Sequence, residues 1–229
     1  KATLDYETKT TYSLTVTASD GSLSDDATIT INVTNMNEAP VAVDATYEIS
    51  EMGTWNVAHT YDQASDVDAG TIMTYTLSDS SVFGIDPSTG VLNLKSMLDY
   101  ETKANYSLIV TASDGSLSDD ATITINVTNV NEAPVAADAT YEISEMGAWN
   151  GAHTYDQASD VDAATILTYT LSDSSVFGID PSTGELRLRG GVDYETKPIH
   201  SLIVNISDGD LGVTAVSYTH LRAHETRIH

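Results

Sequence analysis

The sequence predicts an all-β protein, a tandem series of Greek-key β-sandwich domains of the immunoglobulin-like kind in an elongated array. Three observations predict this class. Segments recur at a spacing of 94 residues, apolar and polar side chains alternate along short runs, and Gly-containing turn sequences separate those runs. A period of this length has the size of a whole domain rather than of one turn of a solenoid, so we expect independent domains joined end to end.

The repeat is visible in two kinds of motif. Leu4-Asp5-Tyr6-Glu7 returns as Leu98-Asp99-Tyr100-Glu101, and Asp193-Tyr194-Glu195 follows another 94 residues on. Asn35-Met36-Asn37-Glu38-Ala39-Pro40 returns as Asn129-Val130-Asn131-Glu132-Ala133-Pro134. Because both motifs keep the same period and are acidic, we expect them to share one role in each domain.

Short runs with a period of two predict the strands. In the best-defined pair of strands the side chains expected to point inward are Tyr106, Leu108, Val110, Ala112, Ala121, Ile123, Ile125 and Val127. Thr, Val, Ile and Tyr dominate these runs, and all of them favour strands. Asp114-Gly115 and the run from Asp86 to Gly90 are typical turn sequences. No stretch has a sustained helical period, so we expect no helix.

The period divides the chain into four segments. Residues 1–39 resemble the second half of a repeat, residues 40–133 form one complete repeat, and residues 134–214 form a truncated repeat. Because the chain begins with Lys1 in the middle of a motif, we interpret it as a fragment of a longer protein.

Residues 215–229 form a tail that differs from the repeats. The inward positions held by Ile123 and Ile125 in the complete repeat become Ser217 and Thr219, and three of the six His residues lie here. The tail closely resembles one reading frame of a transposase sequencing adapter. We therefore interpret it as a non-native, adapter-derived segment, and we expect residues 217–229 to be poorly packed.

Composition excludes several classes of function. The 34 Asp and Glu residues against 9 Lys and Arg give a formal charge of −25, which disfavours binding to nucleic acids and to anionic lipid surfaces. Cations are the natural partners of such a chain.

There is no Cys, so an extracellular repeat would need another stabiliser, such as bound metal. No apolar run is long enough to span a membrane. No nucleophile, zinc or phosphate-loop motif is present, so we do not expect an enzyme.

A series of motifs in fixed order resembles the cadherin family. The complete repeat contains, in order, Ile49-Ser50-Glu51, Ser65 to Gly70, Phe83 to Gly90, Leu98 to Glu101, Ala112-Ser113-Asp114, and the linker Asn129 to Pro134. Each motif is weak alone, but the ordered set, seen in two copies and a partial third, identifies a likeness to cadherin repeats. The linker is one residue shorter than the vertebrate pattern and is more similar to bacterial cadherin-like repeats.

The resemblance implies Ca²⁺ at the joints between repeats. For the first joint it implies Asp5, Glu7, Asn35, Asn37, Glu38, Asp66, Asp68 and Asp114 as ligands. For the second joint it implies Glu51, Asp99, Glu101, Asn129, Asn131, Glu132, Asp160, Asp162 and Asp208. Asn35 and Asn129 replace the Asp that begins the family's linker, so each joint has one carboxylate fewer. We therefore expect two ions rather than three, or weaker binding.

The function implied by the resemblance is cell adhesion by a calcium-stiffened array, outside the cell or at its surface. Like repeats on other cells, surface proteins and glycans are the candidate partners. Two alternatives stay open, both within a large secreted bacterial protein: a passive calcium-stiffened spacer and a carbohydrate-binding module. Phe and Trp are scarce for the latter, and the Tyr residues mostly alternate into strands. We expect Trp55 and Trp149 to serve packing.

Overall fold

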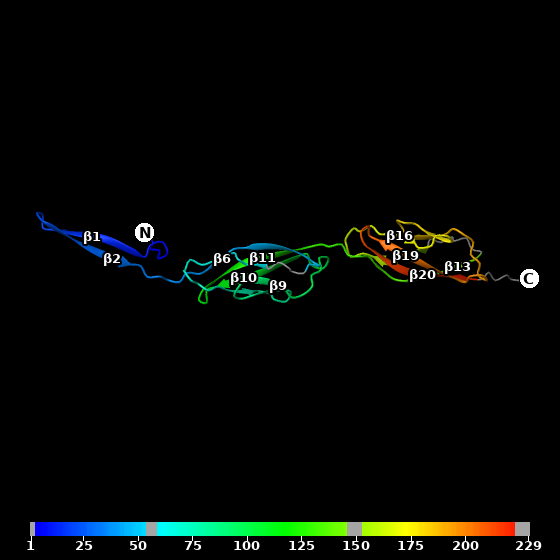
Figure 1. Cartoon of the computed structure of the whole chain (residues 1–229), viewed down its shortest axis with the longest axis horizontal. Helices are drawn as coiled ribbons and strands as arrows, with labels where there is room; N and C mark the ends of the chain where they lie inside the picture. Colours follow the sequence, from blue (N-terminus) through cyan, green and yellow to red (C-terminus); the bar gives the residue numbers. More distant parts are fainter. Residues whose placement is uncertain (1–2, 54–58, 146–152, 223–229) are drawn as a thin grey trace, which may run out of the picture. The chain divides into compact units, whose positions relative to one another are not determined.

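The computed structural model describes residues 3–53, 59–145 and 153–222, and every helix or strand assigned there is a β-strand (Figure 1). The all-β prediction is therefore confirmed. Trp55, Trp149 and tail residues 223–229 lie outside the described residues. The chain forms two compact units, residues 1–129 and residues 130–229. In the described part of the chain, no helix is long and apolar enough to cross a membrane.

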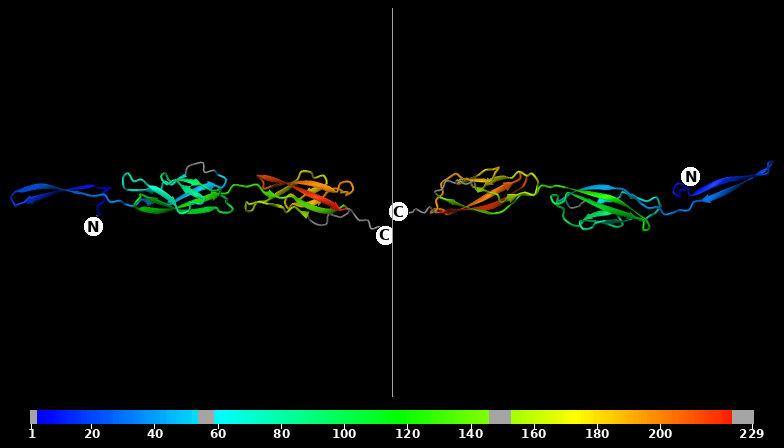
Figure 2. Two further views of the ribbon diagram at one scale, coloured as in Figure 1. Left: turned by 90° about the horizontal axis from the view of Figure 1, so that it is seen from below. Right: turned by 180° about the vertical axis from the view of Figure 1, so that it is seen from behind.

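Unit 1 begins with a hairpin, the blue pair of strands in Figure 2. Its strands β1 (Thr11–Ser19) and β2 (Ser24–Asn32) pair antiparallel. The apolar residues Leu14, Val16 and Ile29 alternate along these strands as predicted, and each is more than 40% exposed: 48%, 46% and 47%.

The rest of unit 1 is a two-sheet sandwich. One sheet has the order β4-β11-β10-β7, the other has the order β5-β9-β8, and β3 pairs with β6. The strands are β3 (Val41–Ala42), β4 (Ala45–Ser50), β5 (His59–Thr60), β6 (Ala64–Ser65), β7 (Thr74–Leu77), β8 (Phe83–Ile85), β9 (Val91–Leu94), β10 (Asn105–Ser113) and β11 (Ser118–Thr128). β4 runs parallel to β11, and the other pairs are antiparallel. The predicted inward residues Val110, Ile123 and Ile125 are 0% exposed, so they form the core.

Unit 2 repeats this architecture. Its larger sheet has the order β13-β20-β19-β16, its smaller sheet has the order β14-β18-β17, and β12 pairs with β15. The strands are β12 (Val135–Ala136), β13 (Ala139–Ser144), β14 (His153–Thr154), β15 (Ala158–Ser159), β16 (Thr168–Leu171), β17 (Phe177–Ile179), β18 (Glu185–Leu188), β19 (Ile199–Ser207) and β20 (Gly212–Arg222).

The first part of the tail corrects one expectation. We expected residues 217–229 to be poorly packed, but residues 217–222 belong to β20, which pairs with β19 and β13. Ser217 and Thr219 are 0% exposed, and Leu221 is 4% exposed. The pairing satisfies the backbone groups of two neighbouring strands, and this gain outweighs the cost of polar side chains in the core.

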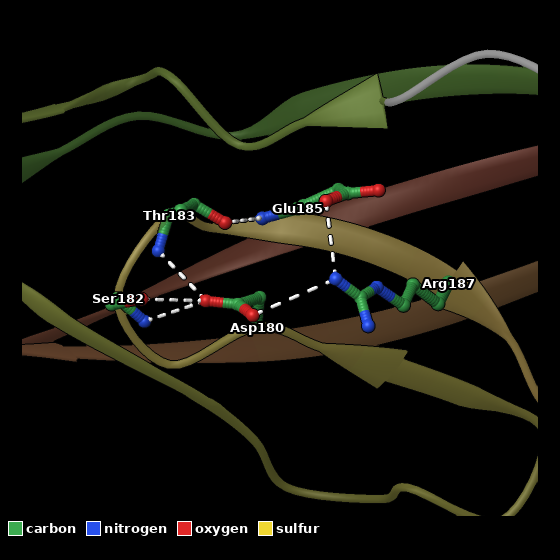
Figure 3. Close-up of polar contacts among 5 residues, drawn as sticks. All are labelled: Asp180, Ser182, Thr183, Glu185 and Arg187. Atoms are coloured by element: carbon green, nitrogen blue, oxygen red, sulfur yellow. Dashed lines mark hydrogen bonds and ion pairs between the residues drawn. The ribbon is translucent and has the colours of Figure 1, made fainter.

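Carboxylates in turns and at bends fix the loops of each unit. Figure 3 shows Asp180 Oδ1 accepting hydrogen bonds from the backbone N–H and hydroxyl of Ser182, at 3.0 and 2.8 Å. Together with the Thr183 N–H, these bonds lower the pKa of Asp180 to about 2. In unit 1, Asp44 accepts a bond from the Thr122 N–H at 2.7 Å, which ties the start of β4 to β11.

Candidate metal centre

The loop that begins at Leu4 contains two acids, Asp5 and Glu7, and Asp5 forms a hydrogen-bonded turn with Thr8. Asp5 accepts hydrogen bonds from the Thr8 N–H at 3.0 Å and from the Thr8 hydroxyl at 2.8 Å. These bonds, the hydroxyl bond first, lower the pKa of Asp5, so it stays ionised. The same Asp–Thr turn recurs at Asp99 and Asp193. Glu7 lies within this turn, and one of its carboxylate oxygens belongs to the cluster described below.

Asp68 ties the linker to the loop that follows β6. Its Oδ1 accepts a bond from the Asn35 side-chain amide at 2.8 Å, and its Oδ2 accepts one from the Glu38 N–H at 3.0 Å. The Asp68 N–H in turn donates to Asp66 Oδ1 at 2.8 Å. Asp66 Oδ2 is buried and has no hydrogen-bond partner among the described residues. A buried carboxylate oxygen without a partner is costly, and a cation would remove that cost.

A second contact joins the linker to the turn after β10. The Asn37 amide donates to Asp114 Oδ2 at 2.7 Å. Asp114 Oδ1 accepts bonds from the backbone N–H groups of Ser116 and Leu117 at 2.6 and 2.7 Å. The Leu117 bond, followed by the Asn37 bond, lowers the pKa of Asp114. The turn therefore presents an ionised carboxylate to the linker.

Three carboxylates converge at this place in unit 1. Glu7, Glu38 and Asp68 each offer one oxygen, and these three oxygens all lie within 4.8 Å of one another. Desolvation and then the negative charges of Glu7, Asp68 and Asp5 raise the pKa of Glu38. Crowded carboxylate and amide oxygens are the hard ligands that Ca²⁺ takes in sites of six to eight oxygens. The donor set therefore fits Ca²⁺.

The far end of unit 1 carries a second acidic group. Glu51 is only 7% exposed, and its Oε2 accepts a bond from the Tyr100 N–H at 2.6 Å. One oxygen each of Glu51, Asp99 and Glu101 lies within 4.8 Å of the other two. The strand β4 thus delivers the buried Glu51 to the loop that bears the recurring acidic motif.

Unit 2 repeats both features of unit 1, the linker contacts and the acidic cluster next to a Tyr N–H. In its linker, the Asn131 amide donates to Asp208 Oδ2 at 2.8 Å, and the Glu132 N–H donates to Asp162 Oδ2 at 2.9 Å. The Asp162 N–H donates to Asp160 Oδ1 at 2.9 Å, and Asp160 Oδ2 is another buried oxygen without a partner among the described residues.

A third acidic cluster lies within unit 2. Glu145, Asp193 and Glu195 each bring one oxygen within 4.8 Å of the other two. The Tyr194 N–H donates to Glu145 Oε2 at 2.9 Å, just as the Tyr100 N–H donates to Glu51 in unit 1.

Comparison with known proteins identifies the family of part of the chain. Residues 47–128 match the family model described as "Cadherin domain". This segment is a cadherin domain. The chain is 35% identical over 87% of its length to the Protocadherin-like wing polarity protein stan of Drosophila melanogaster, and 30% identical over 91% of its length to Protocadherin Fat 1 of Homo sapiens. It spans only 6% and 5% of the lengths of those two relatives.

Solved structures show the same fold. The crystal structure of mouse cadherin-23 EC22-24 aligns with a TM-score of 0.71 over 97% of this chain and 78% of that one, at 24% identity. Protocadherin gamma B7 extracellular cadherin domains 1–4 align with a TM-score of 0.72 over 99% of this chain and 62% of that one, at 21% identity. At these identities the likeness supports the fold, tandem cadherin-type β-sandwiches, which confirms the predicted fold class.

Unit 1 brings together part of the ligand set that was predicted for the first joint. Of the residues implied for the first joint, Glu7, Glu38 and Asp68 converge, and Asn35, Asn37, Asp66 and Asp114 are tied to the linker and its loops by hydrogen bonds. Asp5 is held by Thr8 beside them. The residues implied for the second joint belong to two units, with Glu51, Asp99, Glu101 and Asn129 in unit 1 and the others in unit 2. Their meeting stays a prediction.

Two groups of residues that form or support these acidic clusters were not among the ligands predicted from the sequence. Asp193 and Glu195 belong to an acidic cluster with Glu145, and the 94-residue period from Asp99 and Glu101 was the signal that could have included them. The threonines that hold the recurring Asp, Thr8 and Thr102 among them, gave no separate signal except their fixed position three residues later.

Proposed function

We propose that the acidic ends of these cadherin domains bind Ca²⁺, and that bound Ca²⁺ stiffens the connection between successive domains. The observation that carries this proposal is the convergence of Glu7, Glu38 and Asp68 within 4.8 Å. The first of these comes from the hairpin segment, the second from the linker, and the third from the sandwich. An ion bound by all three ties together segments that are far apart in the sequence.

The 94-residue period extends the proposal to the second joint. Moving each first-joint ligand by one period gives the corresponding acids and amides of the second, and Glu51 joins them as the acid from the start of a repeat. The proposed ligands of the second joint are Glu51, Asp99, Glu101, Asn129, Asn131, Glu132, Asp160, Asp162 and Asp208. The hydrogen bonds from Asn131 to Asp208 and from Glu132 to Asp162 support this, because they reproduce those of the first linker.

The proposed mechanism is electrostatic. Without a cation, the carboxylates of a joint repel one another, and amide and backbone donors such as Asn37 partly offset their charge. With Ca²⁺, the same carboxylates are neutralised and cross-linked. The repulsion between carboxylates, which opposes an ordered linker, is thereby removed. Bending the linker would then break bonds to the ion and cost free energy.

We further propose that the stiffened domains serve adhesion outside the cell or at its surface. Support comes from the relatives named as protocadherins and from the extracellular domains named in the solved structures. Like domains on another cell, surface proteins or glycans are the proposed partners. A non-enzymatic role is part of the same proposal. So is a bacterial origin, which the short linker suggests.

Isothermal titration calorimetry with CaCl₂ tests the metal assignment. We expect binding with a dissociation constant of about 10⁻⁴–10⁻³ M, as is usual for extracellular modules. Asp68→Asn removes one charge from the convergent group and should remove or weaken one class of sites. Glu48→Gln is the matched control, because Glu48 is an exposed acid on β4 outside the clusters, and binding should be unchanged. Equal effects of both substitutions would contradict the assignment.

A bead-aggregation assay tests adhesion separately. Beads coated with the chain should aggregate in millimolar CaCl₂ and disperse when a chelator is added. Calcium binding without aggregation would favour the passive spacer, and binding of coated beads to a glycan array would favour the carbohydrate-binding module.

A further inference from the structure

Unit 2 contains a polar layer where unit 1 has an apolar one. The core positions of Tyr106, Ile123 and Ile125 in unit 1 correspond, 94 residues later, to His200, Ser217 and Thr219. All three polar residues are buried: His200 is 9% exposed, and the other two are 0% exposed. The two units therefore form a natural comparison, with the same fold around different core chemistry.

His200 occupies the place of an aromatic core residue. Its ring meets Phe177 edge-on at 5.2 Å and 72°, and the Tyr106 ring meets Phe83 in the same way at 5.1 Å and 80°. His200 Nε2 is buried and has no hydrogen-bond partner among the described residues, and Ser217 Oγ shares this condition. Thr219 donates to the backbone carbonyl of His200, not to its ring. The ring thus packs as an apolar group does.

The surroundings of His200 oppose a positive charge. The side chains buried in this core cluster, apart from His200 and its polar neighbours, are Ile143, Phe177, Leu186, Leu202 and Leu221. Tyr141 from β13 packs against the cluster, and burial raises its pKa to about 12, so it carries no charge. The charged group that acts on His200 is Lys197, in the loop before β19, and it is also positive. Among the described residues, no carboxylate contributes to the lowered pKa of His200, and Asp173 interacts with Lys197.

We propose that His200 makes unit 2 lose stability at mildly acidic pH, a response that unit 1 does not share. The buried imidazole must stay neutral for β17, β19 and β20 to pack, whereas in the unfolded chain it takes up a proton freely. Desolvation, with a contribution from Lys197, lowers its pKa below the usual 6.5. The unfolded state therefore binds more protons, and stability falls as the pH drops below about 6.5.

The other histidines among the described residues either occupy equivalent positions in the two units or lie at the surface. His59 in unit 1 and His153 in unit 2 occupy equivalent positions beside Tyr47 and Tyr141, so their effects should be similar in the two units. His220 is exposed on β20.

Hydrogen-exchange mass spectrometry on the full chain, in chelator so that metal binding does not contribute, tests the proposal. From pH 7 to pH 5, protection factors of β19 and β20 should fall relative to β10 and β11, by up to about tenfold per pH unit below the unfolded-state pKa. His200→Tyr restores the unit 1 residue and should abolish the difference, and His220→Tyr is the control that should not.

Equal pH responses in the two units, or a response that persists in His200→Tyr, would overturn the proposal. If His200→Tyr does not fold, His200→Leu provides the same neutral core position. The reciprocal change Tyr106→His should confer the acid response on β10 and β11, and no change there would likewise overturn it.

Discussion

The side-chain amide of Asn37 donates a hydrogen bond of 2.7 Å to Asp114 Oδ2, across 77 residues of sequence. The same bond recurs between Asn131 and Asp208 at 2.8 Å. A linker and a distant hairpin turn are thus joined in the same way in two units. The amide offsets a carboxylate's charge without adding one, which shows how this chain keeps an acidic region folded.

Asn35→Asp should tighten calcium binding at the first joint. Asn35 replaces an acid of the family pattern, and its amide lies 2.8 Å from Asp68 Oδ1. The substitution adds a ligand charge but also replaces a hydrogen bond with repulsion. We expect a lower melting temperature in chelator and a higher calcium affinity by calorimetry. Unchanged affinity together with an unchanged melting temperature would show that Asn35 is not at the ion.

Asp162→Ala should weaken calcium binding at the second joint only. Asp162 accepts a bond from the Glu132 N–H at 2.9 Å, so the change removes both a proposed ligand and a support of the linker. The Glu7, Glu38 and Asp68 group lies in the other unit and should keep its affinity, because distant sites act independently. Calorimetry that shows equal loss of both classes of sites, or wild-type binding, would contradict the assignment.

Ser217→Ile with Thr219→Ile should stabilise unit 2. Both side chains are 0% exposed, and Ser217 Oγ has no partner among the described residues. Ile occupies the equivalent positions in unit 1, so the double change should remove a buried unsatisfied group and add apolar contact. We expect a gain of about 1–3 kcal/mol in a urea melt. A loss of stability would show that unit 2 has repacked around the smaller residues.

The strand β20 shows where the sequence was informative and where it was not. Alternation along residues 105–127 predicted the buried Val110 and Ile123, because side chains on one face of a strand share one environment. In β20 the alternation fails at Ser217, yet the strand forms. Backbone pairing with two neighbouring strands determined the register, and the side-chain pattern does not report backbone pairing.

The candidate metal site was likewise predictable from the sequence only in part. The recurring acids identified the participants of the Glu7, Glu38 and Asp68 group, since their spacing repeats in the sequence. The partner of each amide could not be predicted, because the bond from Asn37 to Asp114 depends on how loops far apart in the chain fold toward each other.

Ala164→Gly should stabilise unit 2. Ala164 has a φ of 67°, and it takes the place of Gly70, which has a φ of 84° in unit 1. A left-handed backbone is costly for Ala and free for Gly, so we expect a gain of about 1 kcal/mol in a urea melt. The reverse change, Gly70→Ala, should destabilise unit 1 by a similar amount. If Ala164→Gly proves neutral or destabilising, the backbone at this loop does not carry the inferred strain.

The most direct test of calcium stiffening measures the distance between the hairpin and the sandwich of unit 1. The chain has no Cys, so Thr15→Cys on β1 and Ser107→Cys on β10, both exposed, give a unique pair of spin-label sites. Pulsed electron paramagnetic resonance should give a broad distance distribution in chelator and a narrow one in millimolar CaCl₂, and Asp68→Asn should reduce the narrowing. Distributions of equal width with and without calcium would contradict the account.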